Sequence, residues 1–156
     1  MQTNKRNESM SSTPTFGTQV IGQTEKALGA ILDRQLTGTG LTEPQWVSLN
    51  VALAGNGAVD RGQLSGRIAG VLKVSKPEAQ ARIAELVDAR LLDAPDGTGS
   101  PARLTDAGRQ LHARIRGAVT EITQRLWGDL PADDLATAGR VLSIALERAN
   151  AELSEP

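Results

Sequence analysis

The chain has 156 residues, of which 39% are hydrophobic and 22% charged, so a buried core is expected and global disorder is not. The formal net charge of −1 gives no general attraction to nucleic acid, and any DNA-binding face must come from local clusters of Lys and Arg. The absence of cysteine excludes disulfides and thiolate sites, and one histidine, His112, argues against a zinc site. We therefore expect no metal and no cofactor.

The sequence also lacks the features of a membrane protein and of a common enzyme. No apolar stretch approaches the roughly 20 residues needed to span a bilayer. Residues 1–15 are polar, lack the apolar centre of a signal peptide and are expected to form a disordered tail. Nucleophilic catalysis lacks its usual Cys and His partners. These features predict a cytoplasmic protein that does not bind membranes and is not an enzyme.

Apolar residues recur at helical spacing from Phe16 to Leu32, which predicts a long helix over residues 16–37 that ends before Gly38. Its apolar stripe is wide and suits burial between two partners. Three pairs of residues then predict the starts of three short helices by the capping-box pattern. The pairs are Thr42 with Gln45, Asp60 with Gln63, and Ser75 with Glu78.

Only Lys73 and Val74 separate the last two of these helices, a spacing typical of a helix-turn-helix. Such turns often contain glycine, so Lys73 is expected to adopt a left-handed backbone at a cost of about 1 kcal/mol. Residues 91–94 and 102–105 predict two short strands around a loop rich in Gly and Pro. Thr105 is expected to cap a fifth helix, and a sixth follows the break at residues 129–131.

Three segments of the chain resemble the multiple-antibiotic-resistance regulator (MarR) family. They are IAGVLKVSKP at 68–77, LVDARLL at 86–92 and RLTDAGR at 103–109. The resemblance covers about residues 16–150 and implies a mainly α fold: a winged helix-turn-helix with about six helices and a short β-hairpin wing. It further implies a homodimer, with a dimerisation helix at 16–37, a DNA-binding module at 41–105 and C-terminal dimerisation helices at 106–153.

The second helix of a helix-turn-helix enters the major groove with its N-terminal residues nearest the bases. Here Arg82 suits guanine and Gln80 suits adenine. Ser75 and Lys76 suit phosphate oxygens. Further contacts to the DNA backbone and the wing are predicted at Arg61, Gln63, Arg67 and Arg103. These residues predict a sequence-specific regulator of transcription that binds double-stranded DNA, and we expect a repressor modulated by a small molecule.

Acidic residues support an alternative, a winged-helix protein-interaction module that has lost DNA binding. Glu78 and Glu85 lie on the predicted reading face, where they repel phosphates. The wing loop at 96–100 lacks a basic tip. Asp96 is expected to pair with Arg103 inside the wing, which leaves wing contact with DNA an open question.

The resemblance also implies a cleft between the dimer helices and the winged module for a small aromatic or amphipathic effector. The candidate residues are Trp46, His112 and Arg116. Trp46 lies in an apolar helix and is favoured as a core residue. His112 lies beside the inner stripe of its helix and is expected to be partly exposed or hydrogen-bonded.

Overall fold

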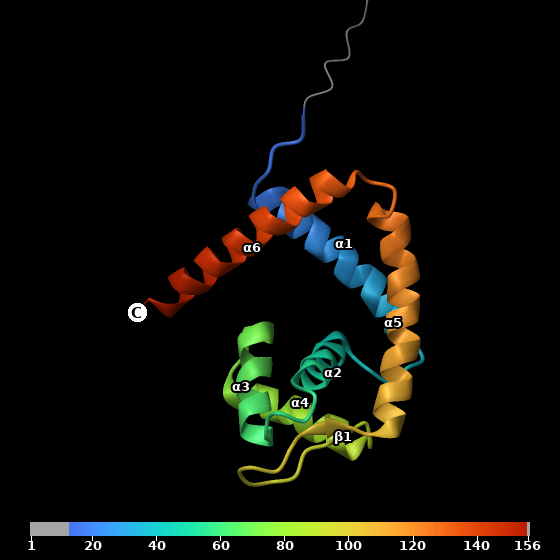
Figure 1. Ribbon diagram of the computed structural model, residues 1–156, viewed down its shortest axis with the longest axis vertical. Coiled ribbons are helices and arrows are strands. Elements are labelled where there is room, and N and C mark those ends of the chain that lie inside the picture. Colours follow the sequence, from blue (N-terminus) through green and yellow to red (C-terminus); the bar gives the residue numbers. More distant parts are fainter. Residues whose placement is uncertain (1–12, 156) are drawn as a thin grey trace, which may run out of the picture.

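Six helices and one two-stranded sheet form residues 13–155, the part of the chain that the computed structural model describes (Figure 1). The helices are α1 (Thr18–Leu36), α2 (Glu43–Gly55), α3 (Arg61–Leu72), α4 (Lys76–Asp88), α5 (Asp106–Trp127) and α6 (Ala132–Ser154). The strands are β1 (Leu92–Asp93) and β2 (Arg103–Leu104). This confirms the predicted winged helix-turn-helix architecture. Most of the predicted tail, residues 1–12, lies outside the described residues.

All three predicted capping boxes are present at the starts of α2, α3 and α4. In the third, the backbone N–H of Ser75 donates to Glu78 Oε2 over 2.8 Å, and the Glu78 N–H donates to Ser75 Oγ over 3.3 Å. Each cap satisfies backbone groups that have no partner within the helix, a contribution of about 1 kcal/mol. Local sequence therefore sets where the three helices of the central module begin.

The turn between α3 and α4 depends on one left-handed residue, as predicted. Lys73 has φ 56° and ψ 43°, and the Val74 N–H donates to the Ala69 carbonyl over 3.2 Å to close the turn. The angle between the two helices lets their apolar stripes meet on α2. The side chains that are fully buried at this junction include Leu49, Leu64, Ile68, Ile83 and Leu86.

The wing is a narrow antiparallel hairpin that is tied to the loop before α3. Leu92 pairs with Leu104, and Asp93 pairs with Arg103. The strands have two residues each, shorter than the four predicted, since the Leu91 N–H still bonds to Leu86 at the end of α4 and Thr105 already caps α5. The Ala102 N–H donates to the Val59 carbonyl over 2.8 Å and fixes the returning strand.

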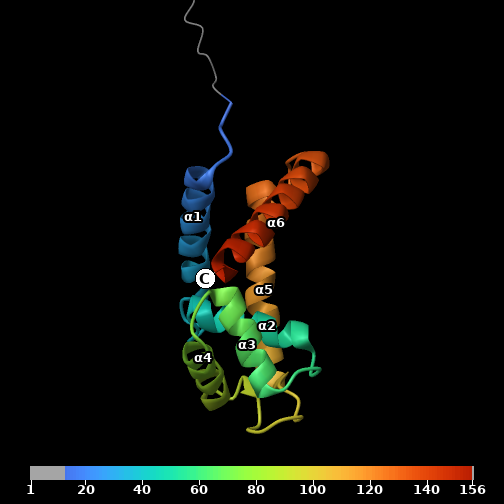
Figure 2. The same cartoon turned by 90° about the vertical axis from the view of Figure 1, so that its left-hand side faces the viewer.

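The long helices lie on one side of this module (Figures 1 and 2). Helix α5 rises from the wing, the chain reverses near Pro131, and α6 runs back across α1. The first half of α5 packs on the core through Leu111, His112 and Ile115. By contrast α6 buries none of its residues, and α1 buries only Leu36. No helix within residues 13–155 is both long and apolar enough to cross a membrane.

Candidate nucleic-acid interface

The exposed N-terminal turn of α4 presents Lys76 and Gln80, two of the predicted DNA-contacting residues. Ser75 precedes them and is committed to the helix cap, because its hydroxyl donates to Glu78 Oε2 over 2.7 Å. The hydrogen bonds from the Ser75 side chain and then its backbone hold the pKa of Glu78 below the ordinary value. The carboxylate is thus held charged at the helix start, where it complements the helix dipole.

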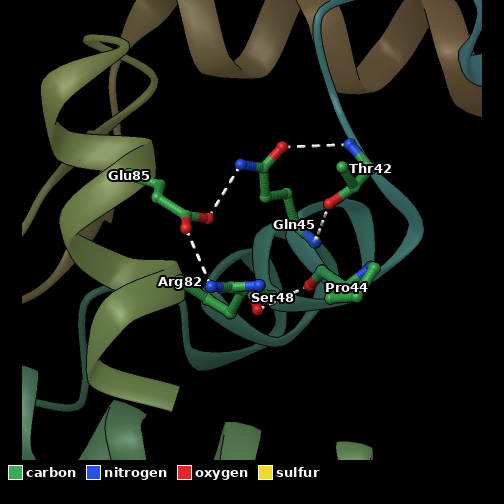
Figure 3. A network of polar contacts seen from close by, with 6 residues as sticks. All are labelled: Thr42, Pro44, Gln45, Ser48, Arg82 and Glu85. Carbon is green, nitrogen blue, oxygen red and sulfur yellow. Dashed lines mark hydrogen bonds and ion pairs between the residues drawn. The ribbon is translucent and has the colours of Figure 1, made fainter. Parts of the chain in front are cut away.

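Arg82 is not directed freely to solvent. Its Nη2 lies 2.8 Å from Glu85 Oε1, and the other Glu85 oxygen accepts a hydrogen bond of 2.8 Å from Gln45 Nε2 on α2 (Figure 3). Gln45 Oε1 in turn accepts from the Thr42 N–H over 2.9 Å. A chain of polar contacts therefore links the predicted base-reading arginine to the start of α2. Within the described residues, Arg82 Nε is buried without a hydrogen-bond partner.

The wing is braced by Arg61 and not by Arg103. Arg61 Nη1 donates to the Ala94 carbonyl over 2.8 Å and lies 3.4 Å from Asp96 Oδ1. The predicted Asp96–Arg103 pair is therefore wrong. The Arg103 side chain instead packs against Gly57, which has φ 73°. A Cβ added to Gly57 would lie only 2.6 Å from Arg103 Nε. The Arg103 side chain thus lies against the loop between α2 and α3, at the foot of the wing.

Asp60, the N-cap of α3, also holds the wing loop in place. Asp60 Oδ1 accepts from the Gln63 N–H over 2.9 Å, and Asp60 Oδ2 accepts from the Gly99 N–H over 3.3 Å. These two backbone hydrogen bonds, that of Gln63 first, lower the pKa of Asp60. The Gln63 side chain completes the cap by accepting from the Asp60 N–H over 3.0 Å. Gln63 is thereby engaged in its own helix.

The structure brings some of the predicted DNA-contacting residues together and separates others. A cavity of about 470 Å³ brings Arg61 and Gln80 together with Asp96 at the wing loop. Arg67 instead lines a separate cavity, where α3 meets α2 and the end of α6. Gln80 therefore shares a surface with the wing loop, while Arg67 lines a different cavity.

Two of the three predicted effector residues meet inside the core. The rings of Trp46 and His112 stack with centroids 4.9 Å apart and planes 24° apart, and both side chains are buried. His112 Nε2 lies 2.7 Å from Asn50 Oδ1, which confirms the hydrogen bond expected for this histidine. Burial lowers the pKa of His112, and the charge of Arg116 lowers it further. Arg116 itself is exposed. A role for this trio in effector binding stays a prediction.

Several polar contacts that organise these sites carried no signal in the sequence. Gln45 and Glu85 are forty residues apart. Asn150, near the end of α6, accepts a hydrogen bond of 2.7 Å from Lys73 Nζ in the helix-turn-helix turn. No spacing rule links residues this far apart in the chain, and only their tertiary placement reveals them. Within residues 13–155 no three His, Cys, Asp or Glu side chains form a cluster that could hold a metal ion.

No protein-family model and no curated protein matches the sequence. The structure, however, is similar to MepR of S. aureus in complex with DNA, with TM-score 0.71, 16% identity, and coverage of 86% of this chain and 96% of that one. A MarR-family protein of Mycobacterium tuberculosis solved with DNA gives TM-score 0.63 and 22% identity over 85% and 98% of the two chains. The same protein solved with salicylic acid gives TM-score 0.59 and 24% identity over 81% and 94%. The chain has the winged-helix fold of MarR-family structures.

Proposed function

We propose that this chain is a MarR-family regulator of transcription that binds double-stranded DNA through α4 and the wing. The observation that carries the proposal is the exposed N-terminal part of α4, which presents Lys76 and where Gln80 lines a cavity with the wing loop, in a module whose three helices each begin with a capping box. A helix presented in this way fits the major groove, with its N-terminus toward phosphates and bases. The DNA complexes among the similar structures support this reading.

The functional unit in this proposal is a homodimer. A groove of about 960 Å³ between α1 and α6 is lined mostly by apolar side chains, including Val20, Ile21 and Leu142, with acidic residues also in the lining. Each of these three residues is more than a third exposed in the single chain. A second copy of the chain would remove this apolar surface from water. The burial of apolar surface is the dominant favourable contribution to most protein–protein association. Two copies of α4 would then read two half-sites about 34 Å apart.

Repression modulated by a small molecule is the finer part of the proposal. It draws on the similar M. tuberculosis protein, which was solved both with DNA and with salicylic acid. A ligand can release DNA only if it binds the DNA-incompetent arrangement of the dimer more tightly than the competent one. The regulator would therefore leave its operator when the ligand accumulates.

The experiment that tests DNA binding is a protection assay on the intergenic DNA that flanks the gene for this chain. We expect protection of a two-fold symmetric site by the parent protein, with an affinity that falls steeply as salt increases. A Gln80→Ala variant is expected to lose preference at one base position in each half-site. Equal, weak binding to every duplex would contradict a sequence-specific regulator.

A second function, a protein-interaction module, is favoured by one observation. Asp96 lies in the wing loop with 96% of its side chain exposed. Its ion-pair partner Arg61 also donates a hydrogen bond to the Ala94 carbonyl and so holds the wing in place. The exposed carboxylate of Asp96 would repel the phosphates of a duplex. If the chain shows no salt-dependent affinity for any duplex while remaining a dimer, the interaction module becomes the better description.

A further inference from the structure

Asp96 is the only charged residue between the two strands of the wing, from residue 94 to residue 102. Its side chain is 96% exposed, whereas that of Arg61, whose Nη1 lies 3.4 Å from Asp96 Oδ1, is 25% exposed. The ion pair therefore presents its negative member to solvent. In both views of the molecule this loop lies at the lower end of the winged module, beyond α3 (Figures 1 and 2).

The loop is tied to α3 on both sides of Asp96. Two residues before Asp96, the Ala94 carbonyl accepts a hydrogen bond of 2.8 Å from Arg61 Nη1. Three residues after it, the Gly99 N–H donates to Asp60 Oδ2 over 3.3 Å. Asp60 and Arg61 are the N-cap and the first residue of α3. The position of the Asp96 backbone is therefore set by α3, and the carboxylate stays with the module when a ligand approaches.

The loop lies beside α4, the recognition helix of the proposed function. Gln80 lines the same cavity of about 470 Å³ as Asp96. The major and minor grooves alternate along a duplex and are separated by one phosphate backbone. When Gln80 meets bases in the major groove, the loop beside it therefore meets that backbone and the minor groove beyond it. Arg103, the cation of the strands, packs against Gly57 at the foot of the hairpin and does not offset the charge of Asp96.

The electrostatic potential of a minor groove depends on its base sequence. A-tracts have a narrow minor groove with an enhanced negative potential, which attracts inserted cations. A carboxylate in the place of such a cation is repelled, and most strongly by the narrowest groove. G·C-rich segments favour A-like geometry, whose minor groove is wide and shallow. The repulsion of Asp96 is therefore smaller where the wing faces G·C pairs.

We propose that Asp96 is a specificity-determining residue, which makes the protein discriminate against A-tracts and in favour of G·C pairs at the bases that the wing faces. The inference rests on the proposed function, because it concerns the wing when α4 is bound to DNA. Gln80 selects bases by attraction in the major groove, and Asp96 selects the flanking bases by repulsion. Such repulsive contacts with competing sites are a general source of specificity.

The test compares two duplexes that share the bases read by Gln80, as defined by the protection assay and the Gln80→Ala variant. One duplex carries A-tracts on both sides of those bases, and the other carries G·C pairs. Fluorescence anisotropy titrations measure the affinity of the full chain for each. We expect the G·C duplex to bind about threefold more tightly at low salt, somewhat less than the roughly fivefold effect of one pair of charges 4 Å apart in water. The ratio should approach one as salt increases, because salt screens exposed charges.

Two variants of the same exposed residue change the charge with little effect on the fold. Asp96→Asn should bind the two duplexes equally and the A-tract duplex more tightly than the parent does. Asp96→Lys should reverse the order, because a cation is attracted to the narrow groove. The matched control is Asp88→Asn, which removes an exposed carboxylate at the end of α4, outside the cavity beside the wing loop. It should keep the parent's preference for the G·C duplex.

The contrary outcomes separate this inference from the proposed function. If the parent binds its site but prefers neither flank, or prefers the A-tract, the proposed function stands and the inference alone is overturned. A preference for G·C pairs that persists at high salt and in Asp96→Asn belongs to the stiffness of the DNA and also overturns it. If the parent binds no duplex at any salt concentration, the proposed function fails and the inference fails with it.

Discussion

Glu85 holds Arg82 on α4: the two residues lie about one helical turn apart, with 2.8 Å between Arg82 Nη2 and Glu85 Oε1. Because Gln45 donates to the second Glu85 oxygen, the carboxylate is fixed from both sides (Figure 3). An arginine held in this way must leave its partner before it can pair with guanine. Glu85 therefore restrains the side chain that we propose reads a base.

Glu85→Ala should tighten DNA binding. The change removes a negative charge near the groove and releases Arg82, so we expect affinity for the operator to rise severalfold at low salt, with Arg82→Ala weakening it. Fluorescence anisotropy titrations at two salt concentrations provide the measurement. If Glu85→Ala weakens binding as much as Arg82→Ala does, the pair positions α4 and does not restrain the arginine.

Lys76→Ala should weaken binding to all duplexes alike. Lys76 is exposed in the first turn of α4 and is expected to contact phosphate and not a base. Loss of one phosphate contact in each subunit lowers the slope of log affinity against log salt by about 2 for a dimer. The control is Lys26→Ala, whose exposed side chain lies on α1 beside Glu25. A base-specific loss in the Lys76 variant would contradict the assignment.

The sequence predicted those features that depend on residues close together in the chain. Ser75 and Glu78 are three residues apart, and Lys73 stands alone between two helix signals, so the caps and the left-handed turn could be predicted from local chemistry. The wide apolar stripe of the first helix, expected to suit burial between two partners, was predicted in the same way, and in the single chain α1 buries only Leu36.

The partners of Arg61 and Arg103 could not be predicted from the sequence. Arg103 is close to Asp96 in the sequence and Arg61 is far from it, so sequence proximity favoured the wrong partner. The choice depends on the hairpin register, which sets Arg103 opposite Asp93, and on Gly57, whose bare Cα leaves room for the Arg103 side chain. Both features belong to the tertiary structure and cannot be read from spacing in the sequence. The same reason explains why the arginine expected to read DNA is linked through Glu85 to Gln45 on another helix.

The protein should lose stability as pH falls below the ordinary histidine pKa of about 6.5. Burial lowers the pKa of His112 in the folded chain, so the unfolded chain binds the proton more readily. The stability is fully present above the unfolded pKa, and part of it is lost as pH falls from there toward the folded pKa. Thermal unfolding between pH 7.5 and 5 measures this loss. His112→Gln should flatten that pH dependence, and an equally steep profile in the variant would assign it to other groups.

Gly108→Ala should destabilise the fold, because a Cβ on Gly108 would collide with the backbone carbonyl of Leu91. The wing enters α5 at this point, and neither backbone can move without disturbing the cap made by Thr105. We expect a loss of about 2–3 kcal/mol in the free energy of unfolding, measured by urea denaturation. The matched control on the same helix is Gly117→Ala, where the Cβ meets nothing within 4 Å and helix propensity improves. Equal stability of the two variants would show that the junction has room to adjust.

Leu142→Glu should convert a dimer into monomers. Leu142 is 44% exposed in the single chain and lines the apolar groove between α1 and α6, so a partner that fills the groove would bury the new carboxylate without a counter-charge. Because α6 buries no residue of its own, the variant chain should still fold, and its molar mass by light scattering should approach that of one chain. The control Gln110→Glu adds the same charge at an exposed position on α5 outside the groove and should leave the mass unchanged. Monomeric Leu142→Glu should also lose most of its operator affinity, since one recognition helix reads only one half-site. A variant that remains dimeric would place the interface on another surface.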